Sequence, residues 1–90
     1  MGVLESHIER TVCKIAEAAG FIQRKVSYVN RNGAPDRFFF GPGGRFVAIE
    51  FKAPGKKPEP HQEREIARLR DLGFEVHVID NIDAGRALFE

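Results

Sequence analysis

The sequence predicts an α/β fold in which a small mixed sheet is flanked by helices, in the order α-β-β-β-α-β with a short closing helix. Three observations predict it: apolar residues at helical spacing near the N-terminus, two strand-like runs around a glycine-rich turn, and a second amphipathic segment followed by an alternating run. Ninety residues leave no room for a second core, so we expect one domain, residues 1–90.

The first half of the chain predicts one helix and three strands. Apolar residues recur at helical spacing from Leu4 to Ala19, and Gly20 ends the pattern, so we expect a helix over about residues 3–19. The strands are expected at residues 21–29, 36–40 (DRFFF) and 45–52 (RFVAIEFK), separated by turns at 30–35 (NRNGAP) and 41–44.

The second half begins with a rigid, basic connection at residues 53–60 (APGKKPEP). Pro60 suits the first turn of a helix, which we expect to run to about residue 72, just before Gly73. Residues 74–79 (FEVHVI) predict the last strand, and residues 83–89 predict the short closing helix.

Charge is unevenly distributed along the chain, although the net charge is only +1. Residues 24–57 carry eight basic residues and only two acidic ones, Asp36 and Glu50. Basic blocks of this kind often contact phosphate backbones, although charge alone also fits a solvated cationic surface.

Cysteine usage and hydropathy limit the class of protein. Cys13 is the only cysteine, which excludes an intrachain disulfide and a cysteine-based zinc cluster. No apolar run approaches the ~20 residues that a membrane span requires, and the N-terminus has no signal-peptide pattern. We therefore expect a soluble, cytoplasmic protein with no membrane partner.

The strand at 45–52 carries two charged side chains on one face. Side chains alternate along a strand, so Glu50 and Lys52 share a face with Ala48, and both faces are otherwise largely apolar. Charges in such a strand are costly to desolvate unless they are paired or bound to a metal. A simple Glu–Lys pair at the end of the strand is the alternative interpretation.

The position of Asp36 favours a metal site over a simple Glu–Lys pair. Asp36 opens the neighbouring strand of a tight hairpin, which can bring its carboxylate near Glu50. Two carboxylates within a basic segment suit a hard cation such as Mg²⁺, and the backbone carbonyl of Phe51 could add a ligand. Lys52 would then orient or help to deprotonate a metal-bound water, or neutralise charge on a phosphate. A surface lysine is the alternative.

These residues resemble a nuclease signature. Pro35-Asp36 followed by Glu50-Phe51-Lys52 resembles the PD-(D/E)XK motif. The longer runs at residues 33–38 (GAPDRF), 49–55 (IEFKAPG) and 60–62 (PHQ) closely resemble the VRR-NUC subfamily. The resemblance implies a restriction-endonuclease-like core and a phosphodiesterase that uses Mg²⁺, with Mn²⁺ able to substitute. Asp36 and Glu50 would be ligands, and Lys52 would lie beside the attacking water.

The resemblance also implies a glutamate on the first helix and a glutamine on the second. We expect Glu9 as the third carboxylate, because its helix resembles that of archaeal Holliday-junction resolvases; Glu5, one turn earlier on the same side, is the alternative. Gln62 is expected to position Lys52 or a water, and it lies in line with the buried face of its helix. A glutamine that remains exposed to water at the first turn is the alternative.

The implied substrate is DNA. Lys25, which matches a lysine of the subfamily, and Lys56 and Lys57 are expected to contact it. Stand-alone relatives resemble dimeric junction resolvases, so we expect a homodimer that cuts branched DNA, foremost a four-way junction. Part of the cluster formed by Phe38, Phe39, Phe40 and Phe46, or the apolar side of residues 74–89, would form the interface. A 5′ flap nuclease and a catalytically silent nucleic-acid-binding module are the alternatives.

Overall fold

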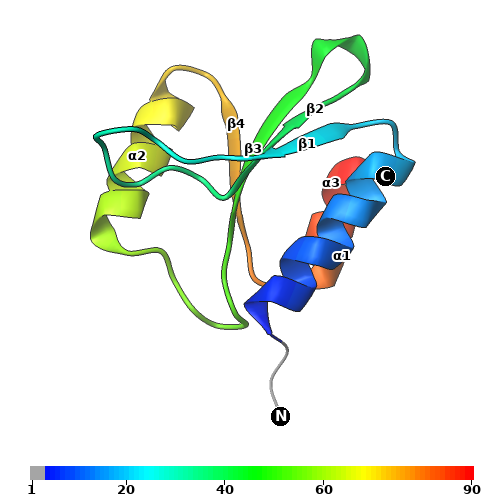
Figure 1. Cartoon of the computed structure of the whole chain (residues 1–90), viewed down its shortest axis with the longest axis horizontal. Helices are drawn as coiled ribbons and strands as arrows, with labels where there is room; N and C mark the ends of the chain where they lie inside the picture. The colour runs from blue at the N-terminus through cyan, green and yellow to red at the C-terminus, as the bar shows by residue number, and fades with distance from the viewer. Residues whose placement is uncertain (1–3) are drawn as a thin grey trace.

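The computed structural model describes residues 4–90 and consists of one four-stranded sheet with helices on both faces (Figure 1). In chain order the elements are α1 (Glu5–Ala18), β1 (Ile22–Lys25), β2 (Arg37–Phe40), the 3-10 turn η1 (Pro42–Gly44), β3 (Phe46–Phe51), α2 (Pro60–Asp71), β4 (Glu75–Ile79) and α3 (Ile82–Phe89). The predicted fold class and order of elements are confirmed.

The sheet is mixed, with the strand order β1-β2-β3-β4. The β1–β2 and β2–β3 pairs are antiparallel, and the predicted hairpin places Arg37 opposite Ile49. Strand β4 is parallel to β3 because α2, which connects them, returns the chain to the end of the sheet at which β3 begins. The two longest strands, β3 and β4, therefore end side by side.

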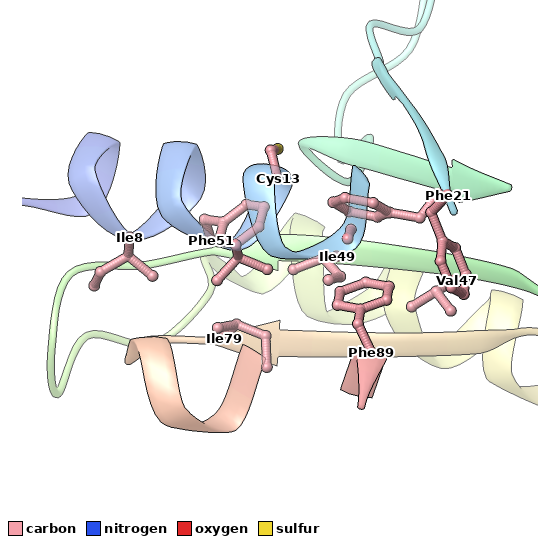
Figure 2. Packing of buried hydrophobic residues seen from close by; sticks show 11 residues of the cluster. Ile8, Cys13, Phe21, Val47, Ile49, Phe51, Ile79 and Phe89 are labelled. Carbon is pink, nitrogen blue, oxygen red and sulfur yellow. The ribbon is translucent and has the colours of Figure 1, made fainter. Parts of the chain in front are cut away.

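Both faces of β3 are covered, as its sequence predicts. Val47, Ile49 and Phe51 pack into a core with α1 and α3, and Figure 2 shows these side chains gathered with Ile8 and Phe89. Ala48 faces the other way, into a smaller cluster with residues of α2 and β4. Side chains alternate along β3, so each residue of the strand, Glu50 included, faces one of these two sides of the sheet.

The first strand is shorter than its sequence predicts. Strand β1 ends at Lys25, whereas the apolar pattern continues to Val29. Lys25 already pairs with Arg37, the first residue of β2, and after the bond from Val26 N–H to the Asp36 carbonyl (3.0 Å) no partner strand continues. Residues 26–35 therefore leave the sheet as a loop toward α2.

Helices α1 and α3 pack closely because Gly85 lies against Val12. A Cβ at Gly85 would overlap the side chain of Val12, which is fully buried. Helix α1 is 14 residues long, and none of the helices within residues 4–90 is long and apolar enough to cross a membrane.

Gly85→Ala separates two opposing effects. Helix propensity favours alanine by roughly 0.5–1 kcal/mol, whereas overpacking a core typically costs about 1–3 kcal/mol. We expect the overlap with Val12 to dominate, so that denaturant unfolding shows a net loss of stability. Ala87→Ser, at an exposed position of the same helix, should stay within about 0.5 kcal/mol of the parent. A stabilised Gly85→Ala variant would contradict the close packing.

Candidate active site

Asp36 and Glu50 lie opposite each other at one end of the hairpin. The pairing of Arg37 with Ile49 places Asp36 beside Glu50 in the antiparallel register, and Asp36 N–H donates to the Ile49 carbonyl at 3.0 Å. Directly opposed residues share a face, with Cβ atoms typically about 4.5–5.5 Å apart. The hairpin thus brings the two carboxylates together, as the sequence predicts.

Glu50 is buried without the donors that a carboxylate requires. Its side chain is 1% exposed, and neither carboxylate oxygen has a hydrogen-bond partner within residues 4–90. Burial, followed by the nearby carboxylate of Asp36, raises the pKa of Glu50 from 4.5 to about 8. A buried carboxylate without partners is unfavourable, so burial of this side chain favours either a bound proton or a bound cation.

Lys52 lies beside Glu50 but does not neutralise it fully. The Lys52 Nζ is 3.9 Å from Glu50 Oε2, and the lysine side chain is 16% exposed. At this distance the attraction partly opposes the rise in the Glu50 pKa, but no hydrogen bond forms. The ammonium group therefore lies next to the carboxylate pair, free to contact a further anion.

The donor set fits a hard divalent cation. Asp36 and Glu50 offer carboxylate oxygens, and the backbone at Phe51 adjoins them because Phe51 N–H donates to Asp36 Oδ2 at 2.7 Å. Within residues 4–90 no three His, Cys, Asp or Glu side chains cluster as a complete metal site. Mg²⁺ commonly takes one or two carboxylates and retains several waters, so two suffice. A ligand role for the Phe51 carbonyl stays a prediction.

The structure separates Glu9 from the carboxylate pair. Glu9 Oε2 accepts a hydrogen bond from Arg37 Nε at 2.6 Å and lies 3.8 Å from Lys25 Nζ. Arg37 points toward α1, on the face opposite to Asp36, because the two residues are adjacent in sequence. The Arg37 guanidinium therefore binds Glu9 on the side of the sheet opposite to Asp36.

Glu5, the alternative carboxylate, is exposed at the start of α1 and has only a weak effect on the carboxylate pair. Its charge is the smallest of the causes that act on the pKa of Glu50. Glu5 begins the helix, one turn before Glu9. The sequence names Glu5 only as the alternative, because the resemblance to archaeal Holliday-junction resolvases favours Glu9, although both glutamates lie on the same side of the helix.

Gln62 has a partner within its own helix. It forms a capping box with Glu59: its Oε1 accepts a hydrogen bond from Glu59 N–H at 2.8 Å, while the Glu59 side chain accepts from the backbone at Gln62. The amide is half-buried and lies on the side of Ile66, as predicted. Its oxygen therefore stabilises the start of α2, and the structure gives it no contact with Lys52.

The three lysines expected to meet DNA are all exposed. Lys25 ends β1 with a side chain that is 72% exposed. Lys56 and Lys57 lie in the loop that leaves β3 directly after Lys52. This loop is fixed by a hydrogen bond from Gly55 N–H to Asp80 Oδ2 at 3.0 Å.

A polar network that the sequence analysis missed anchors the loop before Asp36. Tyr28 OH donates to Glu65 Oε2 at 2.8 Å, and Arg68 Nε donates to Glu65 Oε1 at 3.1 Å. The Glu65 side chain is buried, and the hydrogen bond from Tyr28 is the main cause that lowers its pKa. Tyr28 and Glu65 are 37 residues apart, so no local pattern in the sequence indicates the contact.

Gly33 lets the same loop pack closely on α2. Its φ is +97°, and a Cβ there would lie 2.9 Å from the His61 carbonyl oxygen. Glycine is thus required both for the left-handed backbone and for the close approach. The loop is held at Tyr28 and at Gly33, and it therefore delivers Asp36 to a defined position.

Comparison with known proteins assigns the family. Residues 4–81 match the model of the VRR-NUC domain. The chain belongs to the VRR-NUC family. This family is a subfamily of the PD-(D/E)XK nucleases, so the predicted resemblance is confirmed and the domain is a nuclease domain.

Individual known proteins are similar to this chain along most of its length. A protein named "Putative nuclease p44" from Acyrthosiphon pisum secondary endosymbiont phage 1 is 40% identical over 86 residues, covering 96% of this chain and 92% of the relative. A solved structure described as "VRR_NUC domain" is 35% identical, with a TM-score of 0.89 over 93% of this chain and 91% of that one. A second, "VRR_NUC domain protein", is 18% identical and shares the fold, with a TM-score of 0.77 over 98% and 86% of the two chains.

The buried Glu50 should make the stability of the metal-free VRR-NUC chain fall as pH rises. The pKa of Glu50 is raised from 4.5 to about 8 by folding, so between these values the folded state holds a proton that the unfolded state has lost. In EDTA, the thermal midpoint should therefore be lower at about pH 8 than at about pH 5.5, and Glu50→Gln should reduce that difference. Mg²⁺ at the higher pH should stabilise the parent but not Glu50→Gln. Equal pH dependence in both proteins would contradict the assignment.

Proposed function

We propose that this VRR-NUC chain is a magnesium-dependent endonuclease that hydrolyses phosphodiester bonds in DNA. The observation that carries the proposal is the pair formed by Asp36 and Glu50, in which a buried carboxylate without hydrogen-bond donors faces a second carboxylate. A divalent cation would satisfy both charges at once.

The side chains of the site would have separate roles. Asp36 and Glu50 would hold the cation, with the Phe51 carbonyl beside them and Glu5, in place of Glu9, as the carboxylate from α1. When bound, Mg²⁺ supplies a Lewis acid and lowers the pKa of a bound water. Lys52 directs its ammonium group to the same place, where it would orient the nucleophile or stabilise charge on the phosphate.

The flanking lysines would hold the substrate. Lys25 on one side, and Lys56 and Lys57 on the other, are exposed cations at the end of the sheet that carries Asp36 and Lys52. Phosphate contacts of this kind position DNA without reading its sequence. We favour a branched substrate, a four-way junction before a 5′ flap.

Cleavage of matched duplex, flap, splayed-arm and four-way DNA, with Mg²⁺, Mn²⁺ or EDTA, tests the proposal. Asp36→Asn and Glu50→Gln should abolish cleavage while DNA binding persists, because each removes a ligand charge. Lys52→Ala should lower the rate by about 10²-fold or more without weakening the requirement for metal. Binding without cleavage by the parent under every condition would favour a silent binding module.

The two glutamates of α1 can be distinguished by metal titration. Glu5→Gln should raise the Mg²⁺ concentration needed for half-maximal cleavage, because its charge reaches Glu50. Glu9→Gln should leave that concentration nearly unchanged, since Glu9 is paired with Arg37 and Lys25. If, at saturating DNA, Glu9→Gln raised this Mg²⁺ concentration and Glu5→Gln did not, Glu9 would be the ligand instead.

A homodimer is supported by an apolar surface at the end of the sheet away from Asp36. Phe38, Phe46, Leu69 and Phe74 line a hollow of about 220 Å³. Phe40 and Phe74 at its margin are 46% and 49% exposed, and the rings of both lie within 6 Å of that of Phe46. A second copy docked here about a twofold axis would bury this patch and leave two active sites free to cut paired strands.

Light scattering tests the dimer. The parent should give about twice the 10.1 kDa mass of one chain, because so small a core gains from burying further apolar area. Phe40→Asp combined with Phe74→Asp should give a folded monomer. Val29→Asp, an exposed apolar residue of the loop before Asp36, should remain dimeric. A monomeric parent would remove the dimer and weaken the case for four-way junctions.

A further inference from the structure

A polar groove of about 390 Å³ lies between α1 and the edge strand β1, apart from the carboxylate pair. Four basic side chains line it, against two acidic ones. These are Arg10, Lys14, Lys25 and Arg37, with Glu9 and Glu17. The groove therefore has an excess of positive charge, although α1 as a whole does not.

The charged side chains on the inner wall of the groove already pair with one another. Glu9 is bound by Arg37 at 2.6 Å and by Lys25 at 3.8 Å, and Arg37 also donates to Gln23 Oε1 at 2.6 Å. Arg10 and Lys14, in contrast, form no ion pair with any residue between 4 and 90, and both are exposed. These two side chains are the cations that the groove offers to a ligand.

The groove begins beside the active site and leads away from it. Lys25 pairs across the strands with Arg37, the residue after Asp36, and both of these side chains line the groove. Arg10 and Lys14 are one helical turn apart, so they follow one side of α1. The residues of α1 that line the groove run from Ser6 to Glu17, about 17 Å along the axis at 1.5 Å per residue. A nucleic acid strand carries a phosphate about every 3.4 Å of axis, so this length accommodates several phosphates.

We infer that the groove between α1 and β1 binds the phosphate backbone of DNA outside the active site, through Arg10 and Lys14. The inference rests on the proposed function and extends it to a surface that holds an arm of the substrate. Because a backbone carries regularly spaced negative charge, it fits a row of exposed cations better than a single small anion does.

Salt-dependent binding of a short fluorescent DNA duplex in EDTA tests the groove without cleavage. Arg10→Gln and Lys14→Gln should each weaken binding several-fold and reduce the slope of log affinity against log salt by about 0.9, the value for one lost phosphate contact. Glu17→Gln, in the same groove, should tighten binding. Both cations are exposed, so the variants should fold, and their circular dichroism should match that of the parent.

Arg86→Gln is the matched control, since it removes one exposed charge from α3. If it lowers the slope as much as Lys14→Gln does, or if the groove variants keep the parental slope, the inference is wrong. Displacement of DNA by inorganic phosphate beyond that by chloride at equal ionic strength would also overturn it, in favour of a small-anion pocket. A parent that binds through the groove but never cleaves would refute the proposed function alone.

Discussion

The burial of Glu50 opposite Asp36 is the constraint on which the arrangement of the site depends. A carboxylate that is 1% exposed, without hydrogen-bond donors and beside a second carboxylate, destabilises the metal-free fold at neutral pH. Favourable packing in the rest of the structure offsets this unfavourable burial of Glu50. Apolar residues of β3 pack on both faces of the sheet, so the strand that carries Glu50 is held in place by two cores.

Each neighbour of the carboxylate pair is fixed by contacts distant in sequence. The loop before Asp36 is tied to α2 through Tyr28 and Glu65, and the loop after Lys52 is tied to the end of β4 through Gly55 and Asp80. Preorganised ligands lose little conformational entropy when a cation binds. The hydrogen bonds around the site therefore favour one geometry of Asp36 and Glu50 before any metal is present.

Helix α1 serves two purposes along its length. Its first residue, Glu5, is exposed and has a weak effect on the pKa of Glu50, while Glu9 fixes Arg37 and neutralises the inner wall of a groove. Glu9 is paired with Arg37 and Lys25 and does not neutralise Arg10 or Lys14. These two residues are therefore exposed cations of the same helix. One short helix thus connects the chemistry at the end of the sheet with a surface that suits a phosphate backbone.

The sequence by itself determined the order of elements and the meeting of Asp36, Glu50 and Lys52, because hairpin pairing and the two-residue period of a strand are local rules. It did not determine the partners of Glu9, since Glu5 and Glu9 share one side of the helix and only the docking of α1 on the sheet brings Arg37 and Lys25 to Glu9. The tertiary structure also decided that Tyr28 meets Glu65, 37 residues away. Contacts between residues so far apart depend on how elements pack, which local periodicity does not encode.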